Sequence, residues 1–373
     1  MTETAYAGSS AGGKRVLLAI GLMSGTSLDG VDAALIRTDG VSTVEALGAV
    51  TIPYADDLRK NLRDAIRRAK WLPNTGSLAA ALTRVHANAV ATLSASVGVP
   101  LNSVHVIGFH GQTILHRPKV GLTWQIGDGA LLAELTGVDV VSDFRSADVE
   151  SGGEGAPLAP IFHAAIAAKL EKPVAILNIG GVANVTWINA DGASSLLAFD
   201  TGPGNAMIDD WMLAHMGTLM DKDGALAARG LVHDDILAGL MGNDYFDRSP
   251  PKSLDRNAFS AKSVANLSPS DGAATLTAFT VAAVGRALDH FSTAPARWLV
   301  CGGGRRNPTL MSMLAVRIQA PLEPIEAIGL DGDSLEAQAF GYLAVRHLRG
   351  LPISFPNTTG VSTAMSGGSL DEG

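Results

Sequence analysis

The chain has 373 residues, of which 47% are hydrophobic and 17% charged, and its formal net charge is −8. A negative surface repels a polyanionic backbone, so nucleic acid is excluded as a partner. The length exceeds that of one ordinary core and predicts two compact domains. The single cysteine, Cys301, cannot form an internal disulfide, which favours a reducing compartment, the cytoplasm.

The hydropathy pattern argues against a membrane protein. No apolar stretch reaches the ~20 residues needed to span a bilayer, because even segment 273–291 contains Arg286 and Asp289. Segment 14–23, two basic residues followed by an apolar run, is similar to the start of a secretory signal. It lacks a small-residue cleavage site directly afterwards. We therefore expect a soluble, cytoplasmic protein with no membrane partner.

The first half of the chain alternates between short apolar runs and helix-length segments. Residues 1–13 are rich in small residues without periodicity and predict a mobile tail. Strands are then expected before a mixture of helices and strands. The expected strands are 15–20, 31–38, 44–52, 104–108 and 138–142, and the expected helices are 57–70, 78–97 and 129–135.

The second half repeats this order after a helix at 158–170. Strands are expected at 174–178, 183–188, 196–200 and 298–301, and helices at 205–216, 273–291, 308–318 and 334–348. The repetition predicts two similar α/β domains that flank an interdomain cleft suited to a nucleotide. We place the domains at 14–156 and 157–348, with 349–365 packing back on the first domain and 366–373 as a mobile tail.

The most informative motif is the glycine- and hydroxyl-rich turn at 21–32, between the first two expected strands. Glycines let backbone N–H groups approach a phosphate, and the hydroxyls of Thr26 and Ser27 add donors. Asp29 and Asp32 could hold Mg²⁺ through its water molecules. The alternative is a plain hairpin, for which a two-residue turn would suffice.

A second motif, at 198–205, places Asp200 at a strand end before a turn that contains Gly202 and Gly204 and opens a helix. Such a helix start binds anions, so Asp200 would lie beside a phosphate, as a general base or metal-orienting carboxylate does. The alternative is that Asp200 and Asn205 only cap the helix.

A third turn, at 300–308, has the same strand, glycine and helix order. It contains Gly302, Gly303 and Gly304, followed by Asn307 and by Pro308 at the first helical position. Three glycines permit close packing against a flat ring, for which adenosine is the natural candidate. A turn without a ligand explains this segment almost as well when it is considered alone.

Polar groups near other strand ends are suited to a sugar, which needs several hydrogen bonds and a bidentate partner for a carboxylate. They include His110, Gln112, Asp143 and Arg145, and Arg145 is the candidate for an acidic substituent. Each alone is more often a loop or structural residue. Segment 249–252 fits the Ser-x-x-Lys pattern of a serine nucleophile, but it lies in a proline turn where no helix aligns the pair.

Together these segments resemble the anhydro-N-acetylmuramic acid kinases. The resemblance runs from about Leu18 to Leu348 and is specific because the motifs occur in order along nearly all of the folded chain. The motifs are GLMSGTSLDGVDAALI, GFHGQTILH, DFRSADVESGGEGAPLAPIFH, NIGGVANVT, FDTGPGNAMIDDW, DKDGALAARG, PPKS, CGGGRRNPTLM and GDSLEAQAFGYLA.

The resemblance implies two ribonuclease-H-like domains of the actin-like fold, ATP with Mg²⁺, and a homodimer. It implies that water opens the 1,6-anhydro bridge of the amino sugar, with Asp200 as general base, and that the freed oxygen is phosphorylated. Alternatives are a kinase of an ordinary sugar hydroxyl and a non-catalytic ATP-binding sensor.

By the same resemblance, Glu336 acts near the metal or nucleotide. The ATP phosphates are assigned to Gly25, Thr26, Ser27, Leu28, Asp29, Gly30, Val31 and Asp32. The sugar is assigned to His110, Gln112, Asp143 and Arg145. The chain departs from the usual motifs at Phe109, Glu154, Leu254 and Asp255, which concerns substrate contacts more than phosphate sites.

Overall fold

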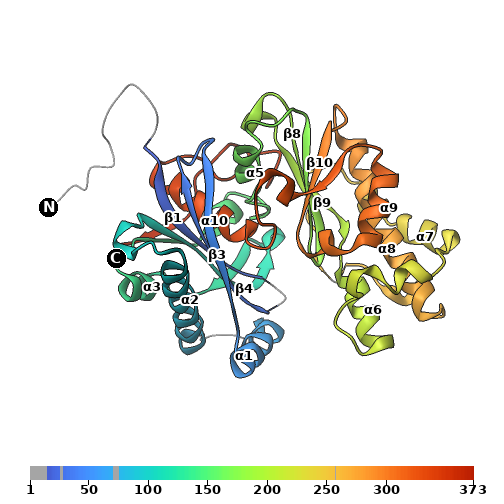
Figure 1. Ribbon diagram of the computed structural model, residues 1–373, viewed down its shortest axis with the longest axis horizontal. Helices are drawn as coiled ribbons and strands as arrows, with labels where there is room; N and C mark the ends of the chain where they lie inside the picture. The colour runs from blue at the N-terminus through green and yellow to red at the C-terminus, as the bar shows by residue number, and fades with distance from the viewer. Residues whose placement is uncertain (1–14, 26–27, 70–74, 257) are drawn as a thin grey trace. The chain divides into compact units, whose positions relative to one another are not determined.

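The computed structural model describes residues 15–25, 28–69, 75–256 and 258–373 (Figure 1). The chain forms two compact units, each with one β-sheet. The first unit contains the chain up to Ala168 together with Ser334–Gly373, and the second unit contains Lys169–Asp333. Each unit is described on its own below.

The sheet of the first unit has the strand order β12-β6-β4-β1-β2-β3, with β5 paired to β4. The first three strands form an antiparallel meander, and β4 and β6 continue the sheet parallel to β1. The strands are β1 (Leu17–Ser24), β2 (Gly30–Thr38), β3 (Val44–Pro53), β4 (Val106–Arg117), β5 (Leu122–Ile126), β6 (Val140–Ser142) and β12 (Ser369–Asp371).

The sheet of the second unit repeats this arrangement, in the order β11-β10-β7-β8-β9. Again three strands are antiparallel, and two further strands extend the sheet parallel to the first of them. The strands are β7 (Val174–Ile179), β8 (Val182–Ile188), β9 (Leu197–Pro203), β10 (Arg297–Cys301) and β11 (Leu322–Pro324). The predicted repetition of one α/β unit, as in the actin-like fold, is therefore confirmed.

Helices cover both faces of the first sheet. Ile20 and Leu22 of β1 share a core with Leu82 and Val90 of α2. Gly21 points to the opposite face, because successive residues of a strand alternate, and there α10 lies so close that a Cβ on Gly21 would be 1.7 Å from the carbonyl oxygen of Ala337. The helices are α1 (Asp56–Arg67), α2 (Gly76–Val97), α3 (Gly129–Thr136), α4 (Ser146–Glu150), α5 (Pro160–Ile166) and α10 (Leu335–Leu348).

The second unit has two apolar clusters that share α8. Val281 and Val284 of α8 pack with the sheet and with Leu310 of α9, whereas Phe279 belongs to a cluster with Phe246 and the residues of α6. α8 is therefore buried along most of its length, and its sequence is apolar with threonines rather than amphipathic. The α-helices of this unit are α6 (Ala206–Met216), α7 (Asp234–Met241), α8 (Pro269–Arg286) and α9 (Pro308–Ile318).

Three predictions require correction. The units divide at Ala168 and Ser334, not at residues 157 and 349, because α10 packs on the first sheet. The prediction of a mobile tail at 366–373 is wrong, since β12 pairs with β6. The strand predicted at 104–108 continues as β4 to Arg117, so His110 and Gln112 are strand residues rather than loop residues.

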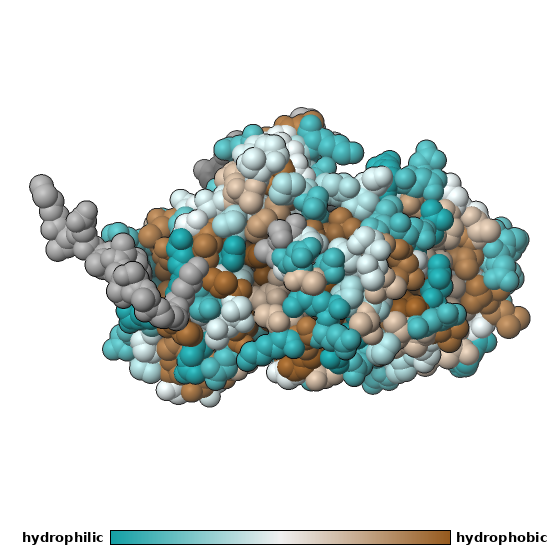
Figure 2. Space-filling view, turned by 90° about the horizontal axis from the view of Figure 1, so that it is seen from above, coloured by the Kyte–Doolittle hydropathy of each residue, from teal (hydrophilic) through white to brown (hydrophobic). Residues whose placement is uncertain are grey.

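In the part of the chain that the structure describes, no helix is sufficiently long and apolar to cross a membrane. On the face that Figure 2 shows, hydrophilic and hydrophobic side chains are interspersed.

Candidate functional site

The turn between β1 and β2 is held at its base by two segments outside the predicted motif. Thr26 and Ser27 lie outside the described residues. Leu28 is buried and has a φ of 60°, a left-handed conformation that is uncommon for a residue with a side chain. The Nε of Arg59, on α1, donates to the carbonyl oxygen of Leu28 at 3.0 Å, and the N–H of Tyr54 donates to that of Asp29 at 3.1 Å.

The remaining residues of this motif differ in packing and exposure. Gly25 precedes the turn, and Gly30 starts β2 against the main chain of Ile52, where a Cβ would be 2.3 Å from the carbonyl oxygen. Val31 is buried in the core. Asp29 is exposed, whereas the carboxylate of Asp32 accepts a hydrogen bond from Thr51 at 2.6 Å. Asp29 is therefore the more accessible carboxylate.

The described residues contain no group of three His, Cys, Asp or Glu side chains that could hold a metal ion.

Gln112 lies at the base of the same turn. It is fully buried, and its Oε1 accepts from the hydroxyl of Ser24 at 2.5 Å while its Nε2 donates to the carbonyl oxygen of Gly25 at 3.2 Å. Ser24 is also 2.6 Å from the hydroxyl of Tyr54. Tyr54 and Arg59 were missed by sequence reasoning, since neither belongs to a glycine motif.

His110 and Arg145 form a buried pair in the first unit. His110 Nδ1 lies 2.8 Å from the carbonyl oxygen of Gly111, and Arg145 donates from Nε (3.2 Å) and Nη2 (3.0 Å) to His110 Nε2. Burial and the charge of Arg145 hold the pKa of His110 well below its usual range. The imidazole is therefore neutral, with its proton on Nδ1.

The other surroundings of Arg145 are polar as well. Its Nη1 donates to the carbonyl oxygen of Gly155 at 2.6 Å. Burial lowers the pKa of Arg145 to about 10, although the charges of Glu336 and Asp148 act in the opposite direction. The structure thus brings His110, Arg145 and the charge of Glu336 together, within a single unit. Asp148, which sequence reasoning missed, accepts from the N–H of Gly155 at 2.6 Å.

Asp143 directly follows β6 and precedes Arg145 by two residues. Its φ is 50°, and its Oδ1 accepts from the hydroxyl of Ser146 at 2.5 Å. Asp residues tolerate this left-handed conformation better than most others. Asp143 therefore forms the sharp turn that follows β6 and leads to Arg145.

In the second unit, Asp200 lies in β9 and is partly buried. Its Oδ2 accepts from the N–H of Leu254 at 2.7 Å, and its carbonyl oxygen accepts from the hydroxyl of Tyr245 at 2.5 Å. Burial, and next the charge of Asp200, raise the pKa of Tyr245. The tyrosine therefore remains a hydrogen-bond donor at any physiological pH.

The turn after β9 is packed against the turn that joins β7 and β8. The N–H groups of Gly204, Asn205 and Ala206 donate to the carbonyl oxygens of Gly180 and Gly181, at 2.7–3.2 Å. A Cβ on Gly202 would be 2.6 Å from Cβ of Ala283, and one on Gly204 would be 2.3 Å from the carbonyl oxygen of Gly180. Close packing thus accounts for both glycines: Gly202, which lies in β9 rather than in the turn, meets the side chain of Ala283, and Gly204 meets the main chain.

The turn after β10 meets the same region. A Cβ on Gly302 would be 2.3 Å from Oδ1 of Asn178, and one on Gly304 would be 2.4 Å from Ile179. Gly303 has more room, since the nearest atom to its Cβ would be Nδ2 of Asn205 at 3.8 Å. Asn307 caps α9 by accepting from the N–H of Leu310 at 3.0 Å.

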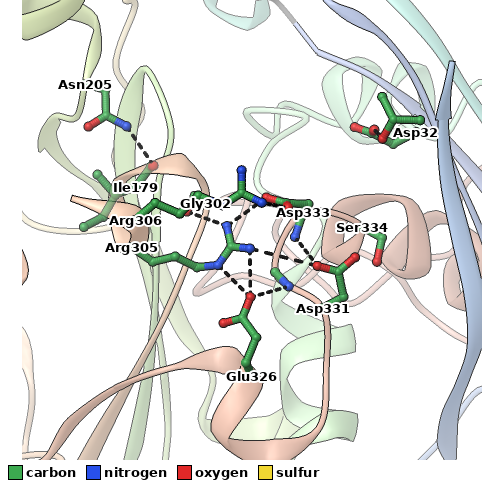
Figure 3. Close-up of polar contacts among 12 residues, drawn as sticks. Asp32, Ile179, Asn205, Gly302, Arg305, Arg306, Glu326, Asp331, Asp333 and Ser334 are labelled. Carbon is green, nitrogen blue, oxygen red and sulfur yellow. Dashed lines mark hydrogen bonds and ion pairs between the residues drawn. The ribbon is translucent and has the colours of Figure 1, made fainter. Parts of the chain in front are cut away.

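Arg305 fixes this turn to the segment that ends the second unit. Figure 3 shows its guanidinium among Glu326, Asp331 and Asp333, with contacts of 2.8, 4.0 and 2.9 Å. It also donates to the carbonyl oxygen of Gly302 at 3.0 Å. Burial acts to lower the pKa of Arg305, but the hydrogen bonds to Asp333 and Glu326 raise it overall. Arg305 is thus permanently charged, and it holds the turn after β10 against the segment that contains Glu326 and Asp333.

Glycine turns after β7, β9 and β10 therefore gather at one end of the second sheet, around Ile179 and Asn205. The carboxyl ends of parallel strands are where α/β proteins bind ligands. Two units of this topology, with glycine turns at their strand ends, define the chain as an α/β protein of the actin-like class.

The comparisons with known proteins give the family. A sequence model of the family described as anhydro-N-acetylmuramic acid kinase matches residues 17–372. An anhydro-N-acetylmuramic acid kinase from Rhizorhabdus wittichii is 52% identical over 94% of this chain and 98% of its own. One from Paramagnetospirillum magneticum is 53% identical over 94% of this chain and 99% of its own. The chain belongs to the anhydro-N-acetylmuramic acid kinase family.

Solved structures are more distant. The crystal structure of component A of (R)-2-hydroxyglutaryl-CoA dehydratase from Acidaminococcus fermentans has a TM-score of 0.49 and 11% identity, covering 89% of this chain and 99% of that one. The assignment to the family rests on the sequence matches alone.

Proposed function

We propose that this chain uses ATP and water to convert anhydro-N-acetylmuramic acid into N-acetylmuramic acid 6-phosphate and ADP, a step in the recycling of peptidoglycan. The proposal is supported by membership of the family. The observation that carries it is the position of Asp200, a partly buried carboxylate in β9, close to the glycine turn that follows this strand.

In this proposal Asp200 is the general base. It takes a proton from a water molecule whose oxygen forms a bond to the anomeric carbon of the sugar. The bond from that carbon to the bridging oxygen of the sugar breaks, and this oxygen, with its new electron pair, attacks the γ-phosphorus. The bond between the γ-phosphorus and the oxygen shared with the β-phosphate breaks in turn, and ADP leaves with that electron pair. One carboxylate thus serves both bond changes, because the phosphoryl group captures the leaving oxygen where most glycosidases supply a second, acidic carboxyl.

The nucleotide is assigned to glycine turns in each unit. The segment from Gly25 to Asp32 would bind phosphates, and the turn at Gly302–Gly304 would bind adenosine, for which the exposed position of Gly303 is suitable. ATP supplies the phosphoryl group when bound. Asp29, an exposed carboxylate, would bind Mg²⁺ through water.

The sugar is assigned to His110, Asp143 and Arg145, with Glu336 near the reacting groups. Gln112 was predicted to contact the sugar as well, but it is fully buried and its amide binds Ser24 and Gly25, so it is assigned to the support of the phosphate turn instead. The neutral His110 and the charged Arg145 together offer a polar, partly preorganised surface, because each already holds the other in place. We further propose that the protein acts as a homodimer in the cytoplasm.

The test is product analysis by mass spectrometry after incubation with ATP, Mg²⁺ and anhydro-N-acetylmuramic acid in ¹⁸O-labelled water. We expect one ¹⁸O at the anomeric carbon and a phosphate on the 6-oxygen. Phosphorylation without ¹⁸O would instead indicate a kinase of an ordinary sugar hydroxyl, and no product would indicate an ATP-binding sensor.

Asp200→Asn separates the role of the base from folding and nucleotide binding. Removal of a positioned base costs ~10²–10⁴ in rate, so turnover should fall by that factor while ATP still binds. Wild-type turnover by this variant would show that Asp200 is not the base.

A further inference from the structure

We propose that Tyr245, Lys252 and the main chain of Leu254 form a clamp whose task is to position the carboxylate of Asp200. These three residues are called the base clamp below. The inference rests on the proposed function, because it takes Asp200 to be the general base. The clamp gives a role to the segment 249–252. This segment matches the Ser-x-x-Lys pattern of a serine nucleophile, but it is not helical as that pattern requires.

The base clamp occupies the open edge of the second sheet. β9 is the last strand in the order β11-β10-β7-β8-β9, so one side of its main chain has no strand partner in that sheet. At Asp200 the clamp supplies the hydrogen-bond partners that a neighbouring strand would otherwise provide. The N–H of Asp200 donates to the carbonyl oxygen of Lys252 at 3.0 Å, and the carbonyl oxygen of Asp200 accepts from the hydroxyl of Tyr245 at 2.5 Å.

The clamp also fixes the carboxylate itself. The N–H of Leu254 donates to Oδ2 at 2.7 Å, two residues after the carbonyl group that binds the Asp200 N–H. The main chain and the side chain of Asp200 are therefore held by one short segment. A rigid main-chain donor commits Oδ2 and defines the direction of the carboxylate, which is what a general base needs to meet a water molecule at a fixed place.

Lys252 anchors the clamp from within the unit. Its side chain is buried, and Nζ donates to the carbonyl oxygen of Tyr245 at 3.2 Å. Nζ also lies 4.9 Å from the ring centroid of Tyr245 and 5.6 Å from that of Phe199, the residue before Asp200. The ammonium thus ties together the two aromatic residues that flank the base, by cation–π contacts and one hydrogen bond.

The decisive experiment removes the Leu254 N–H with Leu254→Pro and compares it with Leu254→Ala, which keeps the N–H and loses only the side chain. Misplacement of a reacting group by about 1 Å costs ~10² in rate. We expect kcat to fall about 100-fold in Leu254→Pro, with KM for sugar and ATP within about twofold of wild type. The loss in Leu254→Ala should be at least about tenfold smaller, because this variant keeps the N–H and loses only side-chain packing against the cluster that contains Tyr245.

The pH dependence of kcat supplies a readout that a purely structural role would not change. A hydrogen bond to an ionised carboxylate favours that form, so the acidic limb of the profile should move to higher pH in Leu254→Pro, by about one unit. Tyr245 stays protonated because burial raises its pKa. Burial lowers the pKa of Lys252 and also that of His290, whose Nε2 lies 3.5 Å from Lys252 Nζ, so the profile of Leu254→Pro is compared with that of Leu254→Ala, in which both groups are retained. An unchanged profile with unchanged kcat would overturn the clamp.

Tyr245→Phe tests the same idea if proline at 254 prevents folding. Its matched control is Tyr342→Phe, which removes another buried tyrosine hydroxyl that donates to a main-chain carbonyl, that of Val41, at 3.1 Å in the first unit. We expect kcat to fall about tenfold only in Tyr245→Phe. Equal effects of the two changes would reject the clamp.

The failure of the clamp and the failure of the proposed function are distinguishable. An inactive Asp200→Asn with normal Leu254→Pro and Tyr245→Phe kinetics would overturn the clamp alone. Full turnover by Asp200→Asn would overturn both.

Discussion

The hydroxyl of Ser24 donates to Oε1 of Gln112 at 2.5 Å, joining the end of β1 to β4, its parallel neighbour. Because Ser24 has one proton, the 2.6 Å contact with Tyr54 must be a donation from the tyrosine. Burial raises the pKa of Tyr54, which keeps that proton in place. The turn assigned to the ATP phosphates therefore starts from a fixed chain of hydrogen bonds.

Gln112→Met should weaken ATP binding about tenfold, because the carbonyl oxygen of Gly25 and the hydroxyl of Ser24 both lose a buried partner. Gln125→Met is the control, since its amide contacts Thr113 and Thr123 on the same sheet instead. Calorimetric titration with ATP measures both. Equal ATP affinity in the two variants would show that Gln112 does not support the turn.

Gly302→Ala should destabilise the second unit, by about 1–3 kcal/mol, because its φ is 74° and a Cβ would be 2.3 Å from Oδ1 of Asn178. Gly303→Ala should change the free energy of unfolding by less than about 1 kcal/mol, since the nearest atom to its new Cβ would be Nδ2 of Asn205 at 3.8 Å. Urea unfolding measures this difference. If Gly303 lies against adenosine, Gly303→Ala should nevertheless weaken ATP binding, and unchanged affinity would remove Gly303 from the nucleotide site.

The buried histidines of the first unit predict a loss of stability in acid. Burial lowers the pKa of His86 to about 4 and that of His163 to about 3, so both are neutral in the folded chain where an unfolded histidine, with a pKa near 6.5, is charged. Between pH 6.5 and these values the unfolded state binds more protons. As the pH is lowered below 6.5, the free energy of unfolding should therefore decrease by ~1.4 kcal/mol per pH unit for each histidine.

His86→Leu isolates one of these contributions. Its free energy of unfolding should fall less steeply than that of the wild type between pH 6.5 and 5, by ~1.4 kcal/mol per unit, and the two slopes should coincide above pH 7. Urea unfolding at a series of pH values provides the comparison. Identical slopes below pH 6.5 would mean that His86 is protonated in the folded protein.

Deletion of residues 369–373 should lower the thermal midpoint by about 5 °C, because β12 pairs with Val140–Ser142 of β6. Since Asp143 and Arg145 directly follow β6, we also expect a higher KM for the sugar. Leu370→Ala is the control, because it keeps the main-chain pairing and changes a residue that is 40% exposed. A truncated protein with the wild-type midpoint and KM would show that β12 contributes nothing.

The sequence alone predicted what depends on local chemistry. Apolar runs bounded by glycine predicted the meanders of both sheets, and α9 was predicted at its observed limits because Pro308 suits its first turn. Asn307, which was assigned to the nucleotide, proves to cap this helix. The glycine turns after β7, β9 and β10 were also visible as patterns. So was Asp200, an acid at the end of an expected strand.

Only the tertiary structure decided which partners surround these patterns. Gln112 and Tyr54 meet Ser24 through strand pairing and a strand-to-helix connection, and Leu254 meets Asp200 from 54 residues away. The buried side chains of Gln112 and Tyr54 are specific, but their partner Ser24 is distant in the chain and only the fold brings them together. Main-chain donors such as the N–H of Leu254 are present in almost any sequence, so they leave no pattern. For the same reason β12 looked like a tail, since its hydrogen bonds to β6 are made by the main chain and leave no side-chain pattern.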